Sequence, residues 1–80
     1  MEYNDIMQQV CRVLTDDFEI DPALLQPQAL LQKEIGIDSL DFVDLIVSIH
    51  DNFGFKPTQD ELKGIKTLSD LCHFIAAHNG

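Results

Sequence analysis

The chain has 80 residues, and its 14 acidic and five basic residues give a formal net charge of −9 at pH 7. A chain of this length builds one modest core, so residues 1–80 are expected to form a single domain with little room for an enclosed catalytic cleft. The negative charge disfavours nucleic acid and anionic membranes as partners and favours basic protein surfaces, and self-repulsion favours a monomer.

A first helix is predicted over residues 3–17, followed by a long connection over residues 19–37. Apolar residues recur at helical spacing in the first segment: Tyr3, Ile6, Met7, Val10, Val13, Leu14 and Phe18. Asp21 and Pro22 are suited to starting a short turn in the connection. The connection has too many apolar residues for a free linker, so we expect it to be ordered against the core: Leu24, Leu25, Leu30, Leu31, Ile35 and Ile37.

The second helix is predicted to begin at a cap on Asp38 or Ser39 and to end near Phe53. Asn52 and Gly54 supply its stop signal. As a capping residue, Ser39 would be worth about 1 kcal/mol of stability.

Two further helices are predicted in the last third of the chain. Residues 58–61 fit a capping box for a short helix that closes near Gly64. Residues 67–70 open the last helix, whose inward face would consist of Leu68, Leu71, Cys72, Ile75 and Ala76. No stretch alternates as a strand would. The predicted fold is all-α: a four-helix bundle with three longer helices, one short third helix and a long ordered loop between helices one and two.

The second helix is predicted to have two apolar faces. At about 100° per residue, one wide stripe suited to the core contains Phe42, Leu45, Ile46, Ile49 and Phe53. Leu40, Val43 and Val47 fall on the opposite side, which should face water. No Lys or Arg occurs from residue 34 to residue 55. The same range contains the carboxylates that edge this second strip or lie near it in the sequence: Glu34, Asp38, Asp41, Asp44 and Asp51. Scattered surface apolar residues are common, but an apolar strip with an acidic rim is also typical of a docking surface.

The segment around Ser39 carries the most specific signal in the chain. Gly36 permits unusual backbone angles before the helix, and Ser39 would lie at its positively polarised end. A capping serine alone is a common feature. His50 would lie almost three helical turns away, too far to act as its base, so a hydrolase is disfavoured.

The stretch Ile35-Gly36-Ile37-Asp38-Ser39-Leu40-Asp41, which opens an acidic helix, resembles the hallmark of the acyl carrier protein family. The length, acidity, helix order and long first loop agree with this resemblance over nearly the whole chain. It implies a carrier without catalysis of its own. Ser39, flanked by Asp38 and Leu40, would be joined to phosphopantetheine by a phosphopantetheinyl transferase. Acyl groups would then travel as thioesters between enzymes of fatty acid or related biosynthesis.

The resemblance also implies roles for the second helix. Acyl-transferring or condensing enzymes with basic patches would dock on Asp38, Leu40, Asp41, Val43, Asp44, Val47 and Asp51. An acyl chain would be sheltered by the core stripe of this helix, including Phe42 and Ile46, together with Leu31 and Ile65 of the neighbouring segments. Several positions depart from the family's usual residues: Ile35, His50, Asn52, Phe55 and Lys56. Because of these departures, a specialised carrier of polyketide, aminoacyl or D-alanyl groups stays open. So does a non-carrier helical interaction module in which Ser39 is only a cap.

No cofactor-binding motif other than this one is found in the sequence. Cys11 and Cys72 lack the spacing of a zinc or redox site and are expected to be buried free thiols. The acidic residues lack the spacing of a calcium loop, so no metal is expected. Residues 1–5 lack the features of a signal peptide and no apolar run could span a membrane. A cytoplasmic protein is therefore expected.

Overall fold

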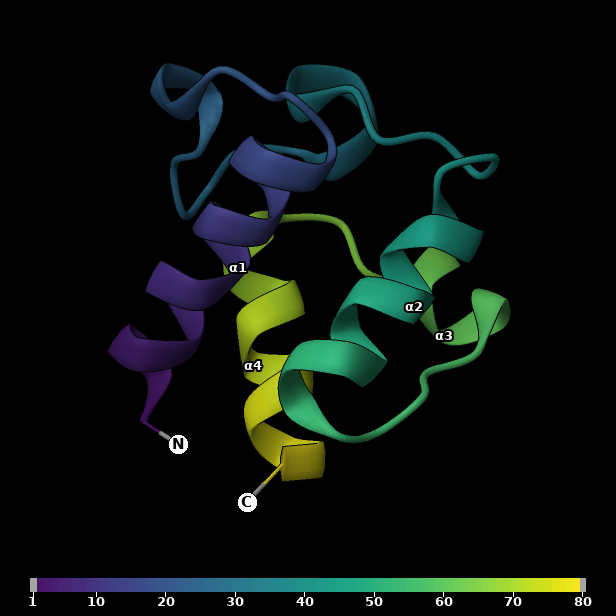
Figure 1. Cartoon of the computed structure of the whole chain (residues 1–80). Helices are drawn as coiled ribbons and strands as arrows, with labels where there is room; N and C mark the ends of the chain where they lie inside the picture. Colours follow the sequence, from purple (N-terminus) through teal and green to yellow (C-terminus); the bar gives the residue numbers. More distant parts are fainter. Residues whose placement is uncertain (1, 80) are drawn as a thin grey trace.

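The computed structural model describes residues 2–79, which form four α-helices and two short helical turns (Figure 1). The α-helices are α1 (Tyr3–Asp17), α2 (Phe42–Phe53), α3 (Gln59–Lys63) and α4 (Leu68–Asn79). Over the described range no strand forms, and the one isolated bridge pairs Leu30 with Thr67. The predicted all-α bundle of three longer helices and one short third helix is confirmed.

Two pairs of helices make up the bundle. α1 packs against α4, and α2 packs against α3. The start of α1 and the end of α4 lie at the same end of the molecule, whereas the connection between α1 and α2 crosses the opposite end (Figure 1). That connection therefore covers one end of the core and delivers the chain to the start of α2.

The core is apolar throughout the described residues, and no polar or charged side chain is fully buried there. Every α-helix contributes to it, and α2 contributes its whole predicted stripe, Phe42, Leu45, Ile46, Ile49 and Phe53. Of the five residues predicted for the inward face of α4, four are completely buried and Ala76 is half-buried against the core: Leu68, Leu71, Cys72 and Ile75 are the buried four. Helical periodicity identified these faces because burial of an apolar stripe, rather than helix propensity, is what stabilises helices of this length.

The long connection is ordered, as predicted, but it contains a helical turn that the sequence did not indicate. η1 (Pro22–Leu24) begins where predicted, and the Asp21 carboxylate accepts a hydrogen bond from the backbone N–H of Ala23 at 2.9 Å. η2 (Leu31–Ile35) is a single π-helical turn. It ends at Gly36, whose φ of 93° lies in the left-handed region that favours glycine.

One residue of the connection was predicted wrongly. Leu24 is 45% exposed instead of packed on the core, while Leu25 next to it is half-buried. Successive side chains of a 3₁₀ turn point about 120° apart, so a single short turn cannot direct both leucines inward.

Backbone hydrogen bonds tie the connection to the start of α4. The N–H of Leu31 donates to the carbonyl of Lys66 at 2.8 Å, and the N–H of Leu68 donates to the carbonyl of Ala29 at 3.0 Å. These bonds flank the Leu30–Thr67 bridge. They hold η2 against a segment more than 30 residues away in the sequence. The residues that join η2 to α2 therefore start from a fixed position.

The remaining helix ends follow the predicted capping chemistry. Thr58 and Glu61 form a complete capping box at α3, and the Thr67 hydroxyl accepts a hydrogen bond from the N–H of Asp70 at 3.1 Å at the start of α4. Gly54 ends α2 with a φ of 82°, and its N–H donates to the carbonyl of His50.

Candidate functional site

The turn that precedes α2 is built around the side chain of Asp38. Its Oδ1 accepts hydrogen bonds from the N–H groups of Leu40 at 2.9 Å and Asp41 at 3.3 Å. The N–H of Phe42 donates to the carbonyl of Ser39 at 3.3 Å, and α2 begins only at Phe42. The prediction that Asp38 or Ser39 caps α2 is therefore wrong, because Asp38 closes a separate turn.

Ser39 is exposed at the tip of this turn. Within residues 2–79 its hydroxyl has no hydrogen-bond partner, so it contributes no capping energy and is accessible from solvent. Leu40, next to it, is 84% exposed. The arrangement presents a hydroxyl on a fixed backbone with no base beside it. Such a hydroxyl can receive a group that another enzyme transfers, but it cannot act as a nucleophile unaided.

The first turn of α2 is also uncapped. Its N-cap residue, Asp41, makes no side-chain cap hydrogen bond. In the described chain the N–H groups of Val43 and Asp44 have no partner. Open N–H groups and the helix dipole make this end of α2 compatible with a negatively charged group on the neighbouring Ser39.

The outer side of α2 is exposed as predicted. Leu40, Val43 and Val47 are 84%, 53% and 51% exposed, and in the described chain the only other large exposed hydrophobic is Leu24. The surrounding acidic residues Asp38, Asp44 and Asp51 are exposed, and Asp41 is half-buried. We call these seven residues, without Leu24, the acid-rimmed strip. Leu40 belongs to the turn before α2 rather than to the helix, so the strip starts beside Ser39.

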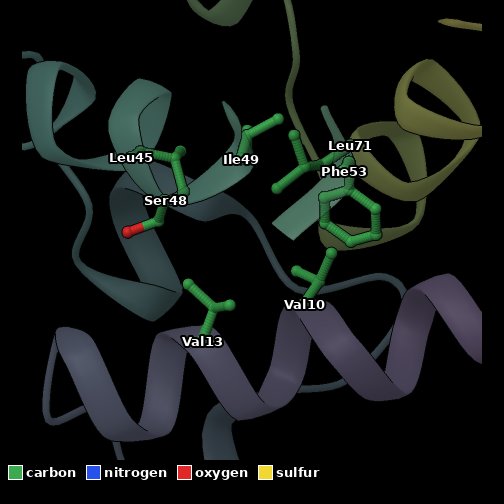
Figure 2. A pocket seen from close by; sticks show the side chains of 7 residues that line it. All are labelled: Val10, Val13, Leu45, Ser48, Ile49, Phe53 and Leu71. Atoms are coloured by element: carbon green, nitrogen blue, oxygen red, sulfur yellow. The ribbon is translucent and has the colours of Figure 1, made fainter. Parts of the chain in front are cut away.

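The space that was predicted to shelter an acyl chain is formed only in part by the predicted residues, because Leu45, Ile49 and Phe53 of the core stripe line an apolar cavity but the other predicted residues do not. Leu31, Phe42 and Ile46 are packed in the core, and Ile65 lines a separate surface groove. The apolar cavity lies between α1 and α2 (Figure 2). Its lining consists of Val10, Val13, Leu45, Ser48, Ile49, Phe53 and Leu71.

This cavity is small, and two polar contacts join the helices on either side of it. Its volume is about 10 Å³, close to the space of one water molecule, so an acyl chain could enter only if α1 and α2 moved apart. The Ser48 hydroxyl donates to the Asp17 carboxylate at 3.1 Å, and the Gln9 amide donates to Asn52 Oδ1 at 3.1 Å. Both contacts cross between α1 and α2. Helical periodicity gave no sign of them, because they join exposed side chains far apart in the sequence.

The two cysteines are free thiols, and neither is poised to react. Burial, with a smaller contribution from the neighbouring Cys11 thiol, raises the pKa of Cys72 to about 12. Burial also raises the pKa of the half-buried Cys11 thiol. Both thiols are therefore protonated near neutral pH, and neither is suited to forming a thioester itself.

Neither a metal site nor a membrane span was found in the residues that the structure describes. No group of three or more His, Cys, Asp or Glu side chains is arranged to hold a metal ion there. None of the described helices is both long and apolar enough to cross a bilayer.

Comparison with known proteins gives a consistent result. Residues 7–75 match the family model for a phosphopantetheine attachment site. The chain is 31% identical to an acyl carrier protein of Thermosynechococcus vestitus, over 94% of this chain and 93% of that protein. It is 28% identical to an acyl carrier protein of Prochlorococcus marinus and 29% identical to one of Lactobacillus acidophilus, over the full length of each.

The matched range covers the exposed turn at Ser39, all of α2 and α3 and most of α1 and α4. The prosthetic group of this family is phosphopantetheine. Its members are not enzymes themselves but carriers that interact with enzymes. The accessible hydroxyl, the open helix terminus and the absence of a nearby base suit that role. The extent of the family match and of the similarity to named relatives shows that the chain belongs to the acyl carrier protein family.

Proposed function

We propose that phosphopantetheine is attached to the Ser39 hydroxyl and that the chain carries acyl groups as thioesters on this arm. The observation that supports the residue assignment is the exposed, unbonded hydroxyl at the tip of the Asp38 turn. The chain's other serines are engaged elsewhere: Ser48 donates to Asp17, and Ser69 hydrogen bonds to Tyr3 at 2.9 Å. Ser39 is the one serine hydroxyl of the described residues that is both exposed and unpaired.

Attachment requires an external enzyme. Ser39 Oγ would form a bond to the phosphorus that carries the pantetheine of coenzyme A, while the diphosphate bond breaks and the nucleotide bisphosphate leaves. A base of the phosphopantetheinyl transferase would take the hydroxyl proton, because no histidine is hydrogen bonded to Ser39 in the described chain. The N–H groups of Val43 and Asp44 can then donate hydrogen bonds to the phosphodiester. The bound arm supplies the terminal thiol that holds the acyl group.

The pathway that we propose is fatty acid or related biosynthesis in the cytoplasm. Its support is the aspartate before the attachment serine and the names of the relatives, which are acyl carrier proteins. We further propose that residues 1–80 act as one monomeric carrier domain, since a net charge of −9 opposes self-association. No partner is expected among nucleic acids, and no insertion into membranes is expected.

The proposed docking surface for partner enzymes is the acid-rimmed strip. Its apolar centre would supply affinity, and its carboxylates would steer and select basic surfaces. No lysine or arginine interrupts the sequence between residues 34 and 55, which concentrates negative charge at this surface. Because the strip begins beside Ser39, a partner that docks there meets the arm directly.

Removal of the apolar centre of the acid-rimmed strip should weaken recognition of the protein by its partner enzymes without unfolding it. For the double variant Val43→Ser/Val47→Ser we expect kcat/KM of the phosphopantetheinyl transferase to fall about tenfold, because about half of each valine would leave water on docking. The measurement is the initial rate of modification at several carrier concentrations. Leu24→Ser is the matched control, since Leu24 is similarly exposed but lies outside the strip. Equal losses in both proteins would contradict docking at the strip.

The carrier function is tested by intact mass. After incubation of the unmodified protein with coenzyme A and a phosphopantetheinyl transferase, the mass should rise by one phosphopantetheinyl group. A further rise by one acyl group should follow after incubation with an acyl donor and a loading enzyme. Peptide mapping should place the group on the peptide that contains Ser39. A protein that takes up no arm would support the non-carrier interaction module instead.

A further inference from the structure

Three of the four lysines in the chain line one groove, on a molecule that is otherwise strongly acidic. Lys33 comes from η2, Lys63 is the last residue of α3, and Lys66 lies between α3 and α4. The groove has a volume of about 360 Å³, and its lining is completed by Leu30, Gln32 and Ile65. It is distinct from the small cavity between α1 and α2, with which it shares no residue.

The backbone holds the two sides of this groove together. The N–H of Leu31 donates to the carbonyl of Lys66 at 2.8 Å, beside the Leu30–Thr67 bridge. Lys33 is therefore fixed near Lys66, although the two residues are far apart in the sequence. The backbone that carries Lys33 and Lys66 is therefore held in place by the fold, and the exposed lysine side chains extend from it.

The lysines of the groove have no carboxylate partners. Among the residues that the structure describes, the one ion pair joins His78 to Glu61. Glu34, which follows Lys33 in the sequence, uses Oε1 to accept the N–H of Leu30 at 3.0 Å. With 14 acidic residues available, unpaired lysines that share one groove are unexpected. Their mutual repulsion would be relieved by a bound anion.

We propose that this groove binds a small anion with a short hydrocarbon stem. The ammonium groups would contact a carboxylate or phosphate group, and the stem would cover the apolar lining from Leu30 and Ile65. The apolar lining argues against inorganic phosphate as a sufficient ligand. The net charge of −9 argues against large polyanions, which the rest of the molecule would repel.

The test uses ¹⁵N-labelled protein with Ser39 unmodified, titrated with hexyl phosphate and followed by amide chemical shifts. We expect saturable shifts at the amides of Lys33, Lys63, Ile65 and Lys66. Hexanol, which lacks the charge, and inorganic phosphate, which lacks the stem, should each bind more weakly. Lys63→Gln and Lys66→Gln should each lower the affinity about two- to fivefold, as expected for exposed charge pairs.

Lys56→Gln is the matched control, because Lys56 is an exposed lysine outside the groove. It should leave the affinity unchanged. The proposal would be overturned by shifts that do not saturate, by shifts confined to the core, or by equal binding of hexanol or of inorganic phosphate. A loss in Lys56→Gln as large as in Lys66→Gln would overturn it as well.

The anion with a hydrocarbon stem could be a free amphiphile. It could also be an acyl group that is carried on the arm and ends in an ionised group. This second comparison rests on the proposed function, whereas the titration of unmodified protein does not. Protein loaded with hexanoyl and protein loaded with adipoyl, which ends in a carboxylate, should be compared by the same amide shifts. Shifts at the groove only with adipoyl would identify the arm's cargo as the ligand, and identical spectra would exclude the cargo and leave a free amphiphile as the source.

Discussion

Replacement of Ser39 by alanine is expected to abolish modification by phosphopantetheinyl transferase completely, while leaving the fold intact. The hydroxyl makes no hydrogen bond within residues 2–79, and the turn around it is held by the Asp38 carboxylate. The free energy of unfolding should therefore change by less than about 0.5 kcal/mol, instead of the 1 kcal/mol or so that a lost cap would cost. Intact mass after incubation with coenzyme A measures the first effect, and urea unfolding measures the second.

Ser48→Ala is the control for this loss of modification. Ser48 lies on α2 and donates a hydrogen bond to Asp17, so the variant removes a serine hydroxyl close in sequence without touching the turn. It should gain the arm at the rate of the unaltered protein. Any arm on Ser39→Ala would disprove attachment at Ser39, and a loss of modification in both variants would point to damage to the docking surface.

The two faces of α2 could be predicted from sequence because they follow from helical periodicity alone. Apolar residues that recur every three to four positions must share a face, whatever surrounds the helix. The buried stripe and the exposed Val43 and Val47 were both identified in this way. The family resemblance then gave the outer face a purpose that periodicity could not supply.

The N-cap of α2 was predicted two to three residues too early because two aspartates with capping chemistry lie close together in the sequence. Asp38 and Asp41 are both good capping residues, and either could have opened the helix. In the structure Asp38 accepts the N–H groups of Leu40 and Asp41 and so forms a turn of its own. The difference matters for function, because Ser39 lies in an exposed turn and not at the cap of the helix, as had been predicted.

Features that depend on tertiary contacts could not be predicted. The π-helical turn η2 is accompanied by the hydrogen bond from Leu31 to Lys66, and no local pattern specifies that pairing. The same pairing gathers three lysines into one groove. The cavity between α1 and α2 was predicted only in part: its α2 side belongs to the core stripe, but its α1 side depends on how the two helices approach each other rather than on either helix alone.

Phe42→Ala is expected to be among the most destabilising single substitutions in the chain. Phe42 is the first residue of α2, and only 1% of it is exposed. Truncation of a buried phenylalanine costs about 3–5 kcal/mol, from lost burial together with the cavity left behind. A domain of this size is stable by only about 4–12 kcal/mol, so the variant should be partly unfolded near physiological temperature. Urea unfolding followed by circular dichroism would measure the loss.

Leu40→Ala is the matched control, because it truncates an apolar side chain two residues away that is 84% exposed. It should change the free energy of unfolding by less than about 0.5 kcal/mol. Phe42→Ala should also slow modification of Ser39, since the Asp38 turn ends directly on Phe42 and would lose its support. Similar losses of stability in the two variants would contradict the assignment of one apolar face of α2 to the core and the other to solvent. The proposed docking surface depends on that assignment.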